Sequence, residues 1–418
     1  MAEIKKASGF IDWLDQRLAV KMLTKVLLSE YWIPKNINFL WAMGVVLIAL
    51  FVLLIVSGIF LLMYYKPDIA LAFDSVNYTI MQEVEYGWLW RHMHGVAASV
   101  TFLVIYIHMF TAIYYGSYKK GREIIWITGM VLFVLFSAEA FSGYMLPWGQ
   151  MSYWAAQVIT NLFGGIPVIG ESLVIWIRGD YLVADATLTR FFMLHVLLLP
   201  LVTIVVIALH FYSLRIPHVN NEESEEFDFD KEAKKYLEGR KKESKVVPFW
   251  PVFLSKDFFI VGAALTGFFF LVCYHYNFAM DPINFEPANN MKTPPHIYPE
   301  WYFLWSYEVL RGFFFDIARI SAMNIGLLAF AFANVIFVIL PFLDLNPNHV
   351  APAHKRPLFK YWFWILVVDM IVLTVYGKLP PTGNNAWVGF YATLVFLFLF
   401  IALPIITKLE AKEQGGEK

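Results

Sequence analysis

The fold is decided by residues 89–115, which have the sequence LWRHMHGVAASVTFLVIYIHMFTAIYY. This stretch is apolar and long enough to cross a bilayer as a helix. It contains His94 and His108, which are 14 residues apart and therefore about 21 Å apart along a helix. Fourteen steps of about 100° bring the second side chain to within about 40° of the first. One predicted helix thus presents two histidines to the same side, at two depths of the membrane.

A second predicted helix, residues 188–214, carries a matching pair. His195 and His210 are 15 residues apart, with Pro200 between them. The extra residue alone would turn the second ring by about 100°. Because a proline removes one backbone hydrogen bond and bends a helix, we expect this bend to help both rings face the first helix.

Two further predicted helices repeat the 14-residue interval with glycine, at Gly44 and Gly58 and at Gly129 and Gly143. Glycine lets a flat group approach a helix backbone closely. Two histidine pairs and two glycine pairs at one interval predict a four-helix bundle that holds two haems, each ligated by two imidazoles. The alternative is that the glycines serve helix packing and the histidines are ordinary core residues. Four matching pairs favour the haem interpretation.

Composition restricts the class of protein. The chain has 418 residues, of which 59% are hydrophobic, and its mean hydropathy is +0.58. These values are typical of a polytopic membrane protein. Its one cysteine, Cys273, excludes a disulfide framework, a cysteine zinc site and an iron–sulfur cluster within this chain. No Cys-x-x-Cys-His motif occurs, so any haem is bound non-covalently, and no basic stretch suggests nucleic-acid binding. We also expect no cleavable signal peptide.

We predict an all-α integral membrane protein with eight transmembrane helices and an N-terminal amphipathic surface helix. The predicted segments are the surface segment 1–37, a four-helix di-haem domain 38–218, a charged linker 219–248 with helix near 231–241, a C-terminal four-helix domain 249–410 and a tail 411–418. The apolar spans lie near 39–65, 89–115, 124–147, 188–214, 257–279, 323–343, 359–377 and 386–407.

The distribution of basic residues predicts the orientation. If the N-terminus is cytoplasmic, 24 of the 32 lysines and arginines lie in cytoplasmic segments. Because cytoplasmic loops carry an excess of these residues, we expect both termini in the cytoplasm.

Two motifs outside the histidine pairs carry a resemblance to a known family. Residues 143–170 are GYMLPWGQMSYWAAQVITNLFGGIPVIG, and residues 299–302 are PEWY. Together with the histidine pairs, they resemble the cytochrome b subunit of the bacterial cytochrome bc complex, the quinol:cytochrome c oxidoreductase, over about residues 30–407. The four-residue motif alone would be a weak signal, whereas the combination is very specific.

The resemblance implies where two haems b would bind. His94 and His195 would ligate the low-potential haem near the outer face, and His108 and His210 the high-potential haem near the cytoplasmic face. Arg91 and Arg190 would pair with propionates of the outer haem. The alternative for these arginines is snorkelling to lipid head groups.

The resemblance also implies a quinol-oxidation site at the outer face. It would comprise Tyr144, Pro147, Trp154, Ala155, Pro299, Glu300, Trp301, Tyr302 and Tyr307. Glu300 would accept a proton from quinol, since a carboxyl group in an apolar pocket has a raised pKa suited to proton exchange. An ordinary interfacial carboxylate is the alternative. One electron would pass to a Rieske iron–sulfur protein and the other through the haems to an inner quinone site at Arg215, Lys256 and Asp257. For Lys256 the alternative is a membrane anchor.

Several positions depart from the family's pattern. The 15-residue interval resembles the chloroplast-type protein, but Ala42 stands where that type has the cysteine of a third haem, so we expect none. Thr111 replaces a common arginine, which leaves Lys119, Lys120 and Arg122 as candidate partners of the inner propionates. Ala155 replaces a common glycine and narrows the outer pocket. Glu139 is an unusual intramembrane acid, either part of a proton path or a hydrogen-bonded packing residue.

The sequence therefore predicts the catalytic di-haem subunit of a respiratory oxidoreductase that releases protons outward. Expected partners are the Rieske protein, a cytochrome c-type subunit and a second copy of the complex, in the inner membrane of a bacterium. Two alternatives stay open. One is a haem b membrane anchor of another quinone-linked oxidoreductase, and the other is a proton or ion transporter without enzyme activity.

Overall fold

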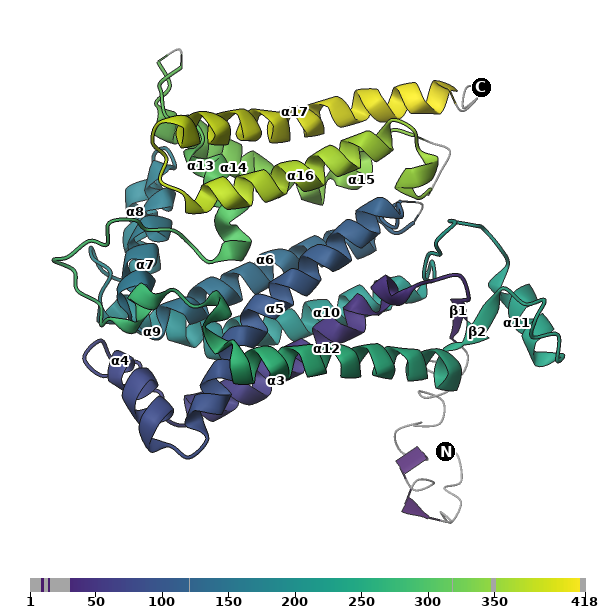
Figure 1. Cartoon of the computed structure of the whole chain (residues 1–418), viewed down its shortest axis with the longest axis horizontal. Helices are drawn as coiled ribbons and strands as arrows, with labels where there is room; N and C mark the ends of the chain where they lie inside the picture. The colour runs from purple at the N-terminus through teal and green to yellow at the C-terminus, as the bar shows by residue number, and fades with distance from the viewer. Residues whose placement is uncertain are drawn as a thin grey trace, which may run out of the picture.

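A computed structural model describes residues 9–10, 14–15, 31–119, 121–317, 319–346 and 351–413. The described chain is almost entirely helical, as predicted (Figure 1). The long helices are α3 (Met43–Leu62), α5 (Gly87–Tyr114), α6 (Glu123–Met145), α12 (Leu254–Tyr274), α16 (Phe359–Lys378) and α17 (Asn384–Glu413). A further rod is built from α9 (Asp185–Met193), a π turn η5 (Leu194–Leu198) and α10 (Leu199–Arg215). The N-terminal amphipathic helix predicted over 1–37 lies mostly outside the described residues.

Among the described residues, 7 helices are long and apolar enough to cross a membrane. The predicted eighth span corresponds to α14 (Ala322–Val338), which has only 17 residues and is followed by the short α15 (Leu340–Leu343). The structure therefore does not confirm the count of eight. Many large apolar side chains on these helices are exposed, among them Phe259, Phe398 and Ile401. Exposed apolar side chains on spanning helices are expected, because lipid replaces water around them.

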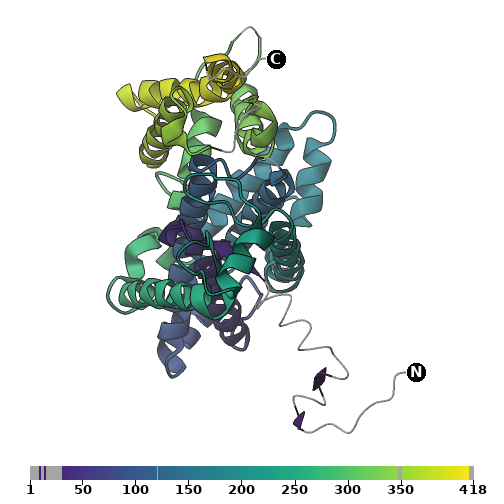
Figure 2. The ribbon, with the colours of Figure 1, turned by 90° about the vertical axis from the view of Figure 1, so that its right-hand side faces the viewer.

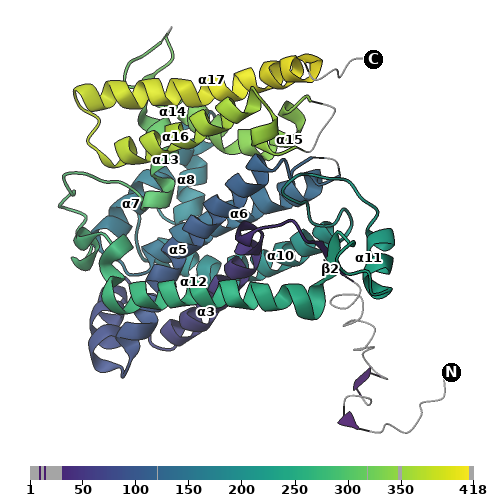
Figure 3. The same cartoon turned by 45° about the vertical axis from the view of Figure 1, so that its right-hand side comes forward.

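The helices form two groups. In the first, α5 packs beside α3, α10 packs beside α6, and α12 lies against α3 and α5. The second group contains α13 (Leu304–Arg311), α14, α16 and α17. Figures 1 and 3 show that α12 lies on the opposite side of α5 from α16 and α17. Figure 2 shows the second group stacked as a separate layer on the first.

A continuous aromatic core joins the two groups. Phe102 of α5 stacks on Tyr302 at a ring-centre distance of 4.0 Å, and Trp305 of α13 donates to the Tyr106 hydroxyl at 2.8 Å. The buried cluster continues through Phe337 and Phe396 of the second group. Burial of such large apolar side chains holds the segment that carries PEWY, which precedes α13, against the histidine-bearing helix α5.

Short elements complete the surface. They are β1 (Trp32–Pro34) and β2 (Val246–Pro248), α4 (Ala72–Asp74), α7 (Gln150–Leu162), α8 (Gly170–Arg178), α11 (Phe229–Leu237), and the single turns η2 (Phe39–Ala42), η3 (Ser75–Glu83), η4 (Phe163–Gly165), η6 (Phe249–Phe253), η7 (Tyr276–Ala279), η8 (Pro282–Phe285), η9 (Trp301–Phe303) and η10 (Ala353–Lys355). β1 pairs antiparallel with β2, and α11 lies in the charged linker near the predicted helix. This pairing places the residues that precede α3 beside the end of the charged linker.

A buried cluster of charged groups joins the two layers at the end of the molecule opposite PEWY. Arg356 forms ion pairs with Asp344 at 2.8 Å and Glu410 at 2.7 Å, and Lys119 lies 3.1 Å from Asp344. The Tyr118 hydroxyl also donates to Asp344, at 2.7 Å. Burial raises the pKa of Asp344, but Arg356 and Lys119 outweigh burial and hold the pKa below its usual value. Buried charges are tolerated here because each has a partner.

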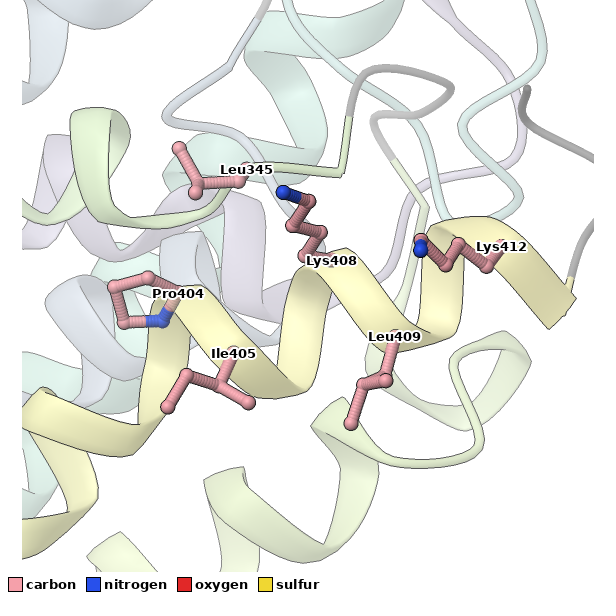
Figure 4. Close-up of a pocket in the computed structure, with 6 residues that line it drawn as sticks. All are labelled: Leu345, Pro404, Ile405, Lys408, Leu409 and Lys412. Carbon is pink, nitrogen blue, oxygen red and sulfur yellow. The ribbon is translucent and has the colours of Figure 1, made fainter.

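Beside this cluster, the last turns of α17 form a shallow hollow with Leu345 (Figure 4). Its walls are apolar apart from two lysines, and the lining residues are Leu345, Pro404, Ile405, Lys408, Leu409 and Lys412. Lysines at the end of an apolar helix are typical of the membrane–water boundary. The hollow has none of the histidines in its wall.

Candidate functional site

His94 lies on α5 and His195 on the rod that contains α10; this pair, predicted to lie nearer the outer face, is called the outer pair, and His108 and His210 the inner pair. The ring centres of His94 and His195 lie 6.1 Å apart, and the ring planes are 86° apart. Two metal–nitrogen bonds of about 2 Å, plus roughly 1.1 Å from each nitrogen to its ring centre, give about 6 Å. The two imidazoles thus have about the separation that two ligands of one iron atom would have.

In the inner pair, His108 lies on α5 and His210 on α10, and His210 is close enough to act electrostatically on His108. Each pair therefore has one ring on α5 and one on the partner rod. The predicted axial spacing places the two pairs about 21 Å apart along α5.

The four glycines lie directly against the four imidazoles. A Cβ atom built on Gly143 would lie 2.5 Å from Cε1 of His195, and the corresponding distances are 3.2 Å for Gly129 and His210, 3.3 Å for Gly58 and His94, and 3.7 Å for Gly44 and His108. The glycines were expected to admit a flat cofactor directly. In the structure each glycine lies against an imidazole of the neighbouring helix, and its contact with a cofactor stays a prediction.

Hydrogen bonds fix the orientation of the rings. Ser57 Oγ lies 3.0 Å from Nδ1 of His94, and Thr128 Oγ1 lies 3.0 Å from Nδ1 of His210. The carbonyl of Leu54 also hydrogen-bonds to His94. An acceptor at Nδ1 favours the tautomer that carries its hydrogen there. Nε2 is then left with its lone pair free for iron, which is the usual arrangement of a histidine ligand.

A π turn explains the 15-residue interval. His195 lies within η5 (Leu194–Leu198), whose backbone hydrogen bonds span five residues where an α-helix spans four. One additional residue is therefore accommodated within a single turn. Pro200 follows η5 within the same continuous rod, where it removes one backbone hydrogen bond. The rings of His195 and His210 can consequently share one side of the rod despite the extra residue.

The carboxyl group of Glu300 lies beside the outer histidines' end of the bundle. It forms a hydrogen bond with the Tyr144 side chain, which comes from the last turn of α6. Burial, together with the nearby Asp281, raises the pKa of Glu300 to about 7, while the Tyr144 hydrogen bond, Arg91 and Lys378 act in the opposite direction. A carboxyl group with this pKa exchanges protons near neutral pH.

The other residues of the predicted outer site lie in buried or half-buried positions. Trp301 Nε1 donates to Ser99 Oγ at 2.7 Å, the Tyr307 hydroxyl donates to the Ile297 carbonyl at 3.0 Å, and Trp154 Nε1 donates to the Asn289 carbonyl at 3.3 Å. Tyr302 stacks on Phe102, Pro147 and Ala155 are buried, and Pro299 is half-buried.

At the opposite end, the three residues of the predicted inner quinone site differ in exposure. The Arg215 guanidinium lies 3.9 Å over the ring of Tyr31, and its Nη1 is buried with no hydrogen-bond partner among the described residues. Asp257 is buried, and its Oδ1 also lacks a partner among those residues. Lys256 is exposed. Two buried polar atoms without partners are compatible with a polar ligand at this end of the bundle.

Comparison with known proteins identifies the family. The family description "Cytochrome b/b6/petB" matches residues 28–217, and "Cytochrome b(C-terminal)/b6/petD" matches residues 287–397. The protein named cytochrome b from Rhodobacter capsulatus is 40% identical over 97% of this chain and 93% of its own length.

The chain belongs to the cytochrome b family. The cytochrome b of Cereibacter sphaeroides is 39% identical over 96% of this chain and 91% of its own length. A solved structure titled "Hyperthermophilic respiratory Complex III" has a TM-score of 0.86 and 38% identity, and the match covers 96% of this chain and all of that one. The resemblance inferred from the motifs is thus confirmed, and membership of the cytochrome b family agrees with haem binding.

Two predicted arginines occupy different environments in this cytochrome b fold. Arg91 is close enough to Glu300 for its charge to lower the pKa of that carboxyl group. Arg190 is exposed, donates to the Trp176 carbonyl and lies against Gly179, where a Cβ atom would come within 2.6 Å of the guanidinium. The propionate role of both arginines stays a prediction.

The candidate partners of the inner propionates already have other contacts. Lys119 is buried against Asp344, and it donates to the Asn346 carbonyl at 2.6 Å. Arg122 donates to the carbonyls of Pro217 and His218 at 3.1 and 3.3 Å. Lys120 lies outside the described residues.

Sequence reasoning missed several residues of the site. Ser57 and Thr128 each stand directly before a glycine of the 14-residue pairs, and this hydroxyl–glycine order was a usable signal. Tyr31 and Asp281 had no such signal. The pairing of β1 with β2 brings in Tyr31, and the loop after α12 brings in Asp281, each from a distant part of the chain.

Proposed function

We propose that the chain is the di-haem b subunit of a respiratory quinol:cytochrome c oxidoreductase. The observation that carries the proposal is the outer imidazole pair, whose ring centres are 6.1 Å apart, next to a buried carboxyl group with a pKa of about 7. The likeness to a respiratory complex III structure supports it over the full length of the chain.

Two non-covalently bound haems b would be held by the two imidazole pairs. His94 and His195 would ligate the low-potential haem, and His108 and His210 the high-potential haem. When bound, the haems supply one-electron chemistry, and the protein supplies ligation, orientation and depth in the membrane. The hydrogen bonds at Nδ1 keep each ring in the tautomer that offers Nε2 to iron.

The outer site would oxidise quinol. Glu300 in its ionised form accepts a proton from the quinol hydroxyl, and Tyr144 orients the carboxyl group through their hydrogen bond. Since Asp281 lies on the same side, the proton can pass toward polar groups at the surface. The adjacent rings of Trp301 and Tyr302 would help to exclude water from the reacting hydroxyl.

The inner site would return electrons to a quinone. Arg215 can donate a hydrogen bond to a quinone carbonyl oxygen, and Asp257 can supply a proton to the reduced product. Tyr31, which lies against the guanidinium, extends the predicted set. Lys256 is exposed and therefore fits better as a membrane anchor at the cytoplasmic surface.

In this proposal the chain lies in the inner membrane of a bacterium with both termini in the cytoplasm. The Rieske protein receives one electron of each quinol, a cytochrome c-type subunit accepts it next, and the complex is a homodimer. The alternatives are a haem anchor of another quinone-linked enzyme and a proton or ion transporter. The Glu300 site disfavours the first, and the imidazole separation disfavours the second.

Redox titration of the purified complex tests this function. We expect two b-type haems with separate midpoint potentials, and we expect His108→Leu to remove only the high-potential one. A matched His94→Leu variant should remove only the low-potential one. A spectrum without b-type bands would support the transporter alternative, and loss of the low-potential signal in His108→Leu would show that the pairing is wrong.

A further inference from the structure

The unusual intramembrane acid Glu139 contacts a proposed haem ligand. It lies on α6, one helical turn before Gly143. Its carboxyl Oε2 is 2.9 Å from Nδ1 of His195, and its own backbone carbonyl oxygen is 3.0 Å from the same nitrogen. The side chain is only 13% exposed, and its Oε1 is buried without a hydrogen-bond partner among the described residues. The carboxyl group is therefore directed at one imidazole.

Two other proposed ligands have a neutral partner at the same place. Nδ1 of His94 lies 3.0 Å from the Ser57 hydroxyl, and Nδ1 of His210 lies 3.0 Å from the Thr128 hydroxyl. Both hydroxyl residues directly precede a glycine that faces the ring. In these two cases the side chain that supports the ligand carries no charge.

At His195 the carboxyl group has replaced the hydroxyl as the close side-chain partner. Ser142 directly precedes Gly143, so it corresponds to the two hydroxyl residues above. Its Oγ lies 3.5 Å from Nδ1 of His195, and it donates to the Ala138 carbonyl at 2.7 Å. His195 thus has a carboxyl partner where His94 and His210 have hydroxyl partners.

A carboxylate that accepts the Nδ1 hydrogen makes the imidazole a stronger donor to its metal. It also places negative charge near the iron. Because an oxidised haem carries one more positive charge than the reduced haem, both effects stabilise the oxidised form. In a membrane interior of low dielectric constant, such a charge acts strongly.

We propose that Glu139 is a positioning residue that lowers the reduction potential of the outer haem through its hydrogen bond to His195. The inference rests on the proposed function, in which electrons pass from the outer haem to the inner one. A lower potential at the outer haem makes that transfer favourable, so the carboxylate would help give the electron path its direction.

The test is a redox titration of the complex carrying Glu139→Gln, with Thr128→Val as the matched change at an inner ligand. Glutamine keeps the shape of the glutamate side chain and an oxygen that can accept a hydrogen bond, but it carries no charge. We expect Glu139→Gln to raise the midpoint potential of the low-potential haem and to leave the high-potential haem unchanged, with electron paramagnetic resonance showing two histidine ligands on each. Glu139→Leu should raise the potential at least as far.

Two results would overturn the inference. An unchanged midpoint potential in Glu139→Gln, with both ligands in place, would reduce the residue to a packing role. Loss of the outer haem in that variant would show a role in retaining haem instead of tuning it. Absence of two haems in the wild-type complex would be a failure of the proposed function itself, which this design separates from the role of Glu139.

Discussion

The four glycines that face the imidazoles give a graded prediction. Replacing each by alanine would place a Cβ atom 2.5 Å from the ring at Gly143, 3.2 Å at Gly129, 3.3 Å at Gly58 and 3.7 Å at Gly44. Carbon atoms in contact rest at about 3.5–4.0 Å. Gly143→Ala must therefore push the His195 ring by about 1 Å, whereas Gly44→Ala needs no movement.

The size of the effect follows from these distances. Overpacking of this kind costs about 1–3 kcal/mol, which corresponds to roughly 5- to 150-fold weaker haem binding. All four alanines also gain about 0.5–1 kcal/mol of helix stability over glycine. Because that gain is common to the four variants, differences between them report the contact with the ring.

The assay is the ratio of haem to protein in the purified complex, measured from the reduced b-type bands. We expect Gly143→Ala to lose the outer haem, Gly129→Ala and Gly58→Ala to lose part of one haem each, and Gly44→Ala to keep both. Equal losses in all four variants would refute the reasoning, since they would mean that the glycines contact the cofactor itself. Full haem content in Gly143→Ala would refute it as well.

Two further predictions concern the quinone sites. Because the pKa of Glu300 is about 7 in place of its usual 4.5, the ionised form that accepts a proton becomes dominant only as the pH rises through 7, so quinol oxidation should accelerate over that range. Glu300→Gln should abolish this rise of the rate with pH and slow quinol oxidation about 100-fold at high pH. A variant whose rate still rose with pH would contradict the role of Glu300 as proton acceptor. At the inner site, Arg215→Leu should slow reoxidation of the inner haem by quinone in flash or stopped-flow measurements. Lys256→Gln, a matched change at an exposed position, should not slow it. Equal effects would argue against Arg215 as a quinone-binding residue.

The positions of the long helices were predictable because the bilayer dictates their length and apolarity. The spans expected at 124–147 and 359–377 correspond to Glu123–Met145 and Phe359–Lys378. The region expected at 323–343 fits less well, since α14 ends at Val338 and a separate turn follows. An apolar run shows where lipid is allowed, but it does not show where a helix stops within that run.

The side-chain contacts of the site residues were less predictable than the helix faces on which these residues lie. Helical periodicity placed Gly143 and His195 at one depth, yet it could not show that the glycine would lie against the ring. Likewise, Tyr31 reaches Arg215 through pairing of β1 with a strand more than 200 residues later. Contacts between distant segments depend on packing, which a local pattern does not encode.

The π turn around His195 has a consequence for how such proteins diverge. A lineage can gain a residue between two ligands if one turn widens to absorb it, so the insertion leaves the distance across the bilayer unchanged. The distance along the helix between the two histidines can then stay the same while the number of residues between them varies.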